Sequence, residues 1–234
     1  MSLPIAVLVS GSGSNLQSII DRIEAGALDA EIKLVISNKA NAYGIQRAKN
    51  YGLPYKVLLH TDYRSREDFD QAMVDAIHGA GIGEEGLVVM AGFMRIVTTT
   101  FLSPFEGRVI NIHPALLPSF PGVNGQADAA DYGVKIAGCT VHFVDEQMDH
   151  GPVIIQAAVP CQAGEDGNAL EPRILKMEHR IFPQAIQWFA ERRLKIVGRH
   201  VELAVSGRPA ASQPMAAIDP PVHALVWPPL EEGF

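Results

Sequence analysis

Asn111 and His113 stand two positions apart in an otherwise apolar segment, residues 109–113. Alternate side chains of a strand point to the same face, so this amide and this imidazole are expected to emerge together. A buried amide is costly unless its donors and acceptor find partners, and the two groups can donate hydrogen bonds to one oxyanion. The pair therefore indicates a site that stabilises negative charge, with a histidine that merely caps the sheet as the alternative.

The residues after His113 stiffen the place where this pair emerges. Residues 114–122 contain Pro114, Pro118 and Pro121, and they are too rich in proline to continue a strand or to begin a helix. A polar pair at the junction of a buried strand and a loop is where α/β proteins place their chemistry.

A candidate acidic partner, Asp149, lies in a second loop, residues 145–152. Aspartate, glycine and proline favour turns, so a plain turn is the simpler interpretation of this loop. The functional interpretation is that the Asp149 carboxylate pairs with a histidine. The separation of His113 and Asp149 along the chain fixes no geometry, so spacing alone does not bring them together.

Two glycines, Gly11 and Gly13, follow the first apolar segment and lead into a helical pattern that begins near residue 14. Such a turn lets the backbone approach a ligand, and the free N–H groups at a helix start favour an anion. The alternative is a simple turn in which Ser14 or Asn15 caps the helix. The dinucleotide pattern GxGxxG fails at Leu16 and the lysine of a P-loop is absent, so a mononucleotide or phosphosugar is favoured over NAD.

A third junction follows the apolar residues 86–90 and places Phe93, Met94 and Ile96 beside a single cation, Arg95. This cluster could line a pocket for a flat ring system, with Arg95 near a carboxylate. It could equally consist of core residues and one solvated arginine.

Apolar periodicity predicts the elements that position these junctions. Helices are expected from near residue 14 and over residues 43–51, 65–80 and 169–191. Strands are expected over residues 5–9, 31–37, 55–58, 86–90, 109–113, 136–143 and 153–159. The alternation of strands and helices predicts an α/β fold with a mostly parallel, twisted sheet and helices on both faces. The short connection 144–152 favours antiparallel strands at one edge.

Composition excludes several classes of protein. Of 234 residues, 47% are hydrophobic, which suffices for a large core, and the net charge of -7 without a Lys/Arg block argues against nucleic-acid binding. Two isolated cysteines, Cys139 and Cys161, give no disulfide framework or metal motif and favour a cytoplasmic location. The start of the chain is not expected to be a signal peptide, and no segment approaches the ~18 apolar residues of a membrane helix.

The end of the chain differs in composition from the rest. We expect a single domain over residues 1–205, followed by a proline-rich tail over residues 206–234 that is irregular or disordered. The role of this tail is open, with a homodimer contact among the alternatives.

Taken together, the junctions resemble those of the phosphoribosylglycinamide formyltransferases (glycinamide ribonucleotide transformylases), a folate-dependent formyltransferase family of purine synthesis. The resemblance covers roughly residues 4–200. The matching segments are SGSGSNL (10–16), AGFMRI (91–96), NIHPALLP (111–118), GCTVHFV (138–144), MDHGPVI (148–154) and MEH (177–179). They are specific as an ordered set, although each alone is weak.

The resemblance implies a Rossmann-like formyltransferase fold and a set of roles. It assigns the phosphate of the substrate phosphoribosylglycinamide to Gly13, Ser14 and Asn15, and the ribose hydroxyls to Glu178. The catalytic residues would be Asn111, His113 and Asp149. The folate would lie against Arg66, Met94, Arg95, Ile96, Val97 and Val144. The phosphosugar half would cover about residues 1–100, and the folate and catalytic half about residues 101–205.

The implied reaction is attack of the substrate amine on the formyl carbon of the co-substrate 10-formyltetrahydrofolate, with no metal. Asn111 and protonated His113 would stabilise the tetrahedral oxyanion, and Asp149 would stabilise the imidazolium and help to move a proton to N10. The substrates would be small molecules, with no nucleic-acid or membrane partner.

The chain departs from the family pattern at three places, one of which is the proline-rich tail after about residue 206, which has no clear counterpart. Residues 123–126 stand where the family commonly carries histidine or other polar residues, and His150 replaces a frequent glycine beside Asp149. Three other functions are weighed against formyl transfer. These are a 10-formyltetrahydrofolate hydrolase, a methionyl-tRNA formyltransferase, which would carry a basic extra domain, and a non-catalytic nucleotide-binding homologue.

Overall fold

The structure, a computed structural model, describes residues 2–205 and 224–234. The chain forms two compact units. The first consists of Met1–Asn111 and Phe143–Gln147, and the second of Ile112–His142 and Met148–Phe234. Strand β5 (Val109–His113) contributes residues to both.

The first unit is built on parallel strands. Strand β1 (Leu3–Val9) lies between β2 (Ala30–Ser37) and β4 (Leu87–Met90), while β3 (Tyr55–Val57) extends the sheet beyond β2 and β5 extends it beyond β4. Every one of these pairings is parallel, as the sequence predicts. The residues of β4 are all buried, which is expected of a parallel strand whose two faces are both covered.

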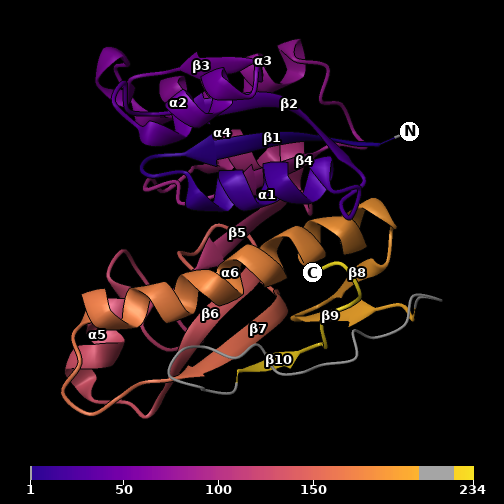
Figure 1. The fold of residues 1–234 in the computed structure, drawn as a ribbon. Coiled ribbons are helices and arrows are strands. Elements are labelled where there is room, and N and C mark those ends of the chain that lie inside the picture. Colours follow the sequence, from indigo (N-terminus) through magenta and orange to yellow (C-terminus); the bar gives the residue numbers. More distant parts are fainter. Residues whose placement is uncertain (1, 206–223) are drawn as a thin grey trace. The chain divides into compact units, whose positions relative to one another are not determined.

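Helices cover both faces of this sheet (Figure 1), which confirms the predicted α/β arrangement. On one face, Leu8 and Met90 pack in a buried cluster with Phe69 and Met73 of α3 (Arg66–Gly79) and Phe101 of α4 (Thr99–Leu102). On the other face, Val9 packs closely against the start of α2 (Tyr43–Asn50). The space between them is so small that a Cβ atom placed on Gly44 would lie 2.9 Å from Val9 Cγ2. Helix α1 (Ser14–Glu24) follows the loop that leaves β1, and short 3₁₀ turns occupy His60–Asp62 and Ser103–Phe105.

The second unit combines antiparallel strands with a long helix. Strand β6 (Ile136–Phe143) pairs antiparallel with β7 (Val153–Pro160), as the short connection predicts. Helix α6 (Gly167–Ala190) contacts β7 and also α5 (Gly125–Tyr132). Strands β8 (Leu194–Val197) and β9 (His200–Leu203) form a separate antiparallel hairpin.

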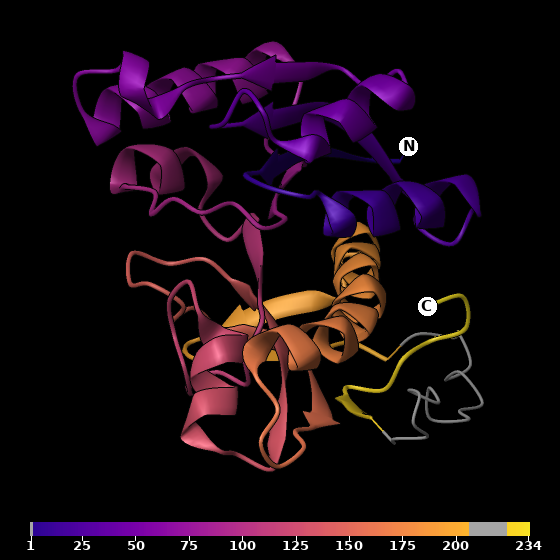
Figure 2. The same ribbon diagram turned by 60° about the vertical axis from the view of Figure 1, so that its left-hand side comes forward.

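The last residues of the chain correct one prediction. The tail is not irregular throughout, because β10 (Leu225–Trp227) pairs antiparallel with β7. Gln184 of α6 holds the segment that follows, since its amide donates to the Pro229 carbonyl and accepts from the Glu231 N–H, and Phe234 is buried. Figures 1 and 2 show this C-terminal segment beside α6. The rest of the predicted tail, residues 206–223, lies outside the described residues.

Sequence patterns missed helices α4 and α5, both strands of the β8–β9 hairpin and strand β10, all of which are short. Helix α5 has the sequence GQADAADY, which carries no apolar stripe, and β10 has three residues between a segment outside the described part and a proline. Within residues 2–205 and 224–234, no helix is long and apolar enough to cross a membrane.

Candidate active site

Two predicted residues, His113 and Asp149, meet in the second unit. His113 Nδ1 lies 3.5 Å from Asp149 Oδ2, and the imidazole is 3% exposed at the end of β5. A second imidazole faces the other carboxylate oxygen, with His142 Nε2 3.8 Å from Asp149 Oδ1. One carboxylate therefore lies between two buried histidines.

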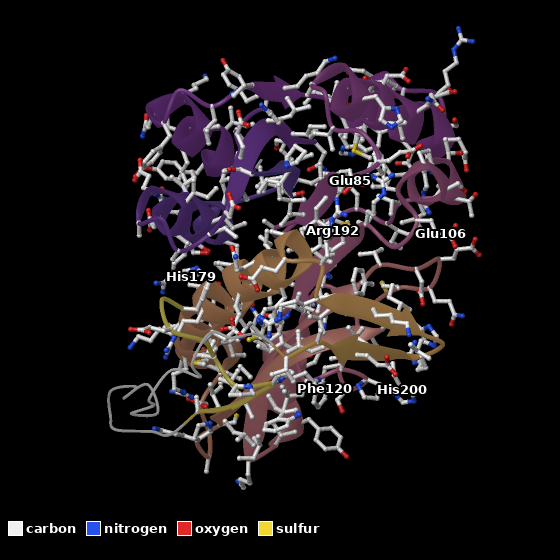
Figure 3. All side chains as sticks on the ribbon, turned by 90° about the vertical axis from the view of Figure 1, so that its right-hand side faces the viewer. Glu85, Glu106, Phe120, His179, Arg192 and His200 are labelled. Atoms are coloured by element: carbon white, nitrogen blue, oxygen red, sulfur yellow. The ribbon has the colours of Figure 1, made fainter. Side chains whose placement is uncertain are left out.

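The other nitrogen of the His113 ring is held by the loop that follows β5. His113 Nε2 lies 2.8 Å from the carbonyl oxygen of Phe120, the residue labelled in Figure 3. A carbonyl oxygen can only accept, so Nε2 carries a hydrogen in this contact. Nε2 is thus placed as a hydrogen donor, and Nδ1 faces the carboxylate.

The turn at Asp149 brings its carboxylate into this position. Asp149 has a left-handed backbone, with φ of 52°, a conformation that aspartate tolerates better than most residues. Its Oδ2 accepts a hydrogen bond of 2.7 Å from the Gly122 N–H. The Asp149 turn is therefore hydrogen-bonded to the loop after β5. A turn without a further role would not need this contact.

The proline-rich loop is also fixed to the antiparallel strands. Thr140 of β6 donates to the Ala115 carbonyl at 2.7 Å and accepts from the Leu117 N–H at 3.1 Å. Gln156 of β7 donates to the Leu117 carbonyl at 3.0 Å and to the Thr140 hydroxyl at 3.0 Å. These contacts give the loop a defined backbone next to His113.

Asn111 lies in the first unit, on the same strand as His113. It is the one residue of β5 that is not fully buried, and it pairs in register with Met90 of β4. Because residues two apart on a strand point to one face, the Asn111 amide and the His113 ring are expected to share a face of β5. The Asn111 side chain is half-buried and already has interaction partners within the protein.

The glycine loop of the first unit leads directly into helix α1 and is braced by α2. Gly13 has φ of 67°, and the helix α1 begins at Ser14 without a side chain on the N-cap residue to satisfy its N–H groups. Helix α2 holds the loop by its carbonyls, because the Gly44 N–H donates to Gly11 O at 3.0 Å and Arg47 Nε donates to Ser12 O at 2.9 Å. This bracing and the cation of Arg47 suit a phosphate at the helix start.

Gly13 permits this close approach, and its replacement by alanine is expected to destabilise the fold. A Cβ atom on Gly13 would lie 2.6 Å from Gly44 Cα, whereas Gly26, with nearly the same φ of 69°, has nothing within 4 Å of that position. Gly26→Ala is expected to cost about 1–2 kcal/mol through its backbone conformation alone. Gly13→Ala is expected to cost about 1–3 kcal/mol more, because the loop must move away from α2.

Urea unfolding of the two variants measures this difference. Equal free energies of unfolding for Gly13→Ala and Gly26→Ala would show that the contact between the glycine loop and α2 contributes nothing.

The segment Met94–Val97 follows β4 in the first unit, and its apolar side chains are not all part of the core. Met94 and Ile96 are each 54% exposed, while Val97 is buried and belongs to the core cluster. Two hydrogen bonds hold the backbone of this segment. Met94 N donates to the Ser10 hydroxyl at 2.8 Å, and Thr98 N donates to the Asp70 carboxylate at 2.6 Å. Exposed apolar side chains on a fixed backbone suit a flat ring system.

Burial raises the pKa of the Asp70 carboxyl, with the negative charge of Glu67 as a smaller contribution in the same direction, while the hydrogen bonds to Thr98 lower it. Asp70 is 1% exposed, which agrees with burial as the largest cause of this shift. The guanidinium of Arg95 lies 5.9 Å from the centre of the Phe69 ring, so Arg95 packs against the core as well as carrying charge.

The remaining predicted residues lie at three further places. Arg66 is the exposed first residue of α3, and Val144 donates its N–H to Val109 O at 2.9 Å, both within the first unit. Glu178 is buried in α6 of the second unit. Burial raises the pKa of the Cys139 thiol well above its usual range, and the charge of Glu178 raises it further, so Cys139 is an unreactive core thiol.

His150, the unusual neighbour of Asp149, is engaged by the β8–β9 hairpin. Arg199 Nη1 donates to the His150 carbonyl and lies 3.2 Å from His150 Nδ1, which accepts because a guanidinium only donates. Figure 3 labels His200, the next residue of the hairpin. His150 therefore links the turn of Asp149 to the hairpin.

The structure thus brings His113 and Asp149 together and adds His142, which sequence reasoning left without a role. A polar residue in a buried strand is the same signal that singled out Asn111, and it could have identified His142 as well. Asp70 and Ser10 were also missed, because a single acid on a helix or a serine after a strand carries no distinctive pattern. In residues 2–205 and 224–234, no group of three or more His, Cys, Asp or Glu side chains could hold a metal ion.

Comparison with known proteins places these features in a family. Residues 3–186 match the family model described as formyl transferase. The chain is 42% identical over 192 residues to the phosphoribosylglycinamide formyltransferase of Escherichia coli K12, which covers 82% of this chain and 89% of that one. It is 44% identical over 186 residues to the human trifunctional purine biosynthetic protein adenosine-3, of which it spans only 18%.

Solved structures agree with this result. The crystal structure of glycinamide ribonucleotide transformylase 1 from Symbiobacterium toebii superposes with a TM-score of 0.84 at 46% identity, covering 87% of this chain and 95% of the other. At this level of identity the two chains share one fold, which has the mostly parallel sheet, the helices and the antiparallel strands described above.

Proposed function

The chain belongs to the formyl transferase family, and on that premise we propose that it transfers the formyl group of 10-formyltetrahydrofolate to the amine of 5'-phosphoribosylglycinamide. The products are formylglycinamide ribonucleotide and tetrahydrofolate, in purine biosynthesis. The observation that carries the proposal is the Asp149 carboxylate between the His113 and His142 rings, 3.5 Å and 3.8 Å away. This arrangement suits proton movement during acyl transfer.

In this proposal, the substrate phosphate binds to Gly13, Ser14 and Asn15. The glycine loop supports this assignment, because its Gly11 and Ser12 carbonyls already accept hydrogen bonds from α2. Glu178, a buried carboxylate of α6, would accept hydrogen bonds from the ribose hydroxyls. Both roles are carried over from the family.

The folate would lie against Met94, Arg95, Ile96 and Val97, with Val144 nearby and Arg66 toward its glutamate. Two observations support this assignment, namely the 54% exposure of Met94 and Ile96 and the hydrogen bonds that fix the backbone on both sides of the segment. The role of Arg66 rests only on its exposed charge at the start of α3.

The chemistry begins when the substrate amine forms a bond to the formyl carbon and a tetrahedral oxyanion develops. Asn111 and protonated His113 donate to this oxyanion, and Asp149 stabilises the imidazolium. The bond between the formyl carbon and N10 then breaks, while the proton lost by the amine moves to N10 through Asp149 or a water that it holds. If Nε2 of His113 is the donor, the substrate oxygen takes the place of the Phe120 carbonyl, which accepts from Nε2 at 2.8 Å.

The proposed function extends to the organisation and location of the enzyme. Residues 1–205 would act as one catalytic domain, with the phosphosugar bound by about residues 1–100 and the folate and chemistry carried by about residues 101–205. The reaction would take place in the cytoplasm, without a metal, nucleic-acid or membrane partner, and a homodimer is one assembly to test.

A spectrophotometric assay of folate release tests the proposed function. Release that requires phosphoribosylglycinamide and yields the formylated ribonucleotide supports the transferase. Release of formate at the same rate with and without the ribonucleotide would assign a hydrolase instead, and binding of the ribonucleotide without turnover would indicate a non-catalytic homologue.

A further inference from the structure

Ser10 lies between the two segments of the first unit that the proposed function assigns to different substrates. It follows β1 directly and precedes the glycine loop, and it is 3% exposed. Its N–H donates to Gly92 O at 3.0 Å, and its hydroxyl accepts from Met94 N at 2.8 Å. One buried serine is thus hydrogen-bonded to the start of the folate segment, Met94–Val97, and is joined through the backbone to the glycine loop.

The orientation of the Ser10 hydroxyl is fixed by a third residue. Its hydrogen is donated to Asn38 Oδ1 at 2.6 Å, and Asn38 is 2% exposed just after β2. A hydroxyl has one hydrogen, so its lone pairs are left to accept from Met94 N. Loss of either side chain removes a buried partner from this chain of hydrogen bonds.

We infer that Ser10, oriented by Asn38, is a positioning residue that couples binding of the phosphosugar to binding of the folate. This inference rests on the proposed function, which supplies the two ligands. A phosphate on the N–H groups of the glycine loop restrains the backbone next to Ser10, and the Ser10 hydroxyl passes that restraint to Met94. By linkage, a folate held on Met94 restrains the loop to the same extent.

The contact at the other end of the folate segment does not provide this link. The Asp70 carboxylate accepts from Thr98 N at 2.6 Å, but Asp70 belongs to α3 and not to the strand that leads into the glycine loop. Ser10 is therefore the place where the two segments share both a backbone and a hydrogen bond.

Calorimetric titration with tetrahydrofolate, with and without saturating glycinamide ribonucleotide, tests this coupling. These two ligands cannot react, because neither carries the formyl group. In the unmodified chain, the ribonucleotide is expected to change the Kd of tetrahydrofolate by about 5-fold or more. In Ser10→Ala the change is expected to fall below about 2-fold, and the Kd of tetrahydrofolate alone to rise about 10-fold, because Met94 N loses its acceptor.

Two further variants separate coupling from general loss of structure. Asn38→Ala is expected to reduce the coupling in the same direction, since it releases the Ser10 hydroxyl. Ser37→Ala is the matched control, because the Ser37 hydroxyl is equally buried but bonds only within its own turn, to Lys39 O at 2.9 Å and Lys39 N at 3.1 Å. It is expected to keep the coupling of the unmodified chain.

The possible results decide between the inference and the function on which it rests. The inference would be overturned if coupling persists in Ser10→Ala and Asn38→Ala, or if Ser37→Ala loses it equally. It would also be overturned if the unmodified chain has the same Kd for tetrahydrofolate with and without the ribonucleotide. Failure of the unmodified chain to bind either ligand would instead refute the proposed function, and the inference with it.

Discussion

Replacement of His113 by alanine is expected to lower the turnover number by about 10²–10³, because the oxyanion loses a hydrogen-bond donor and its developing charge loses a cation. The Michaelis constants for both substrates are expected to change much less, since the lost interaction forms mainly in the transition state. Initial-rate measurements over both substrate concentrations separate these effects.

His200→Ala serves as the control for this variant. His200 is an exposed histidine at the start of β9 in the same unit, and its loss is expected to leave turnover unchanged. Because His113 is 3% exposed, thermal unfolding of His113→Ala must show that the protein is still folded. A folded His113→Ala protein with near-normal turnover would remove His113 from the mechanism.

Asp149→Asn is expected to lower turnover by about 10² or more while the turn keeps its shape. The asparagine retains an oxygen that can accept from the Gly122 N–H, a bond of 2.7 Å in the unmodified protein. It loses the charge that stabilises the His113 imidazolium and the base that assists proton transfer. The loss therefore reports the charge at this position and not the hydrogen bond to the loop.

Asp166→Asn provides a matched comparison. Asp166 also accepts a backbone hydrogen bond, from Ala169 N at 2.9 Å at the start of α6, and asparagine is as good an N-cap as aspartate. Its turnover is expected to remain normal. Equal, small effects of the two substitutions would show that the Asp149 charge has no part in catalysis.

The parallel strands of the first unit were predictable because each carries a short apolar run between polar turns. The predicted ranges of β2, β3, β4 and β5 agree with the structure to within one residue at each end, and so do those of the antiparallel strands β6 and β7 in the second unit. Helix α5 and strand β10 were not predictable in this way. The first lacks an apolar stripe, and the second is a strand only because β7 offers it an edge to pair with.

The candidate site was predictable only in part, for a related physical reason. The alternation of Asn111 and His113 along one strand is a local property, and the sequence reveals it directly. The approach of Asp149 to His113 depends on a left-handed turn and on a hydrogen bond to Gly122, and neither can be inferred from spacing. The resemblance to a family supplied that partner before the structure did.

The Asp149 carboxylate has a more complex environment than the resemblance implied. His142 faces it from β6, and Arg199 of the β8–β9 hairpin engages the backbone and ring of the adjacent His150. The departure from the usual glycine at position 150 is thus accommodated by a contact on the hairpin.

Transfer of an isotopic label tests the central claim most directly. The unmodified chain is incubated with phosphoribosylglycinamide and 10-formyltetrahydrofolate that carries ¹³C in its formyl group, and the products are separated and identified by mass spectrometry. The label is expected on the amine of the ribonucleotide, in equal amount to the tetrahydrofolate released. Label recovered as formate, or retained on the folate, would contradict it.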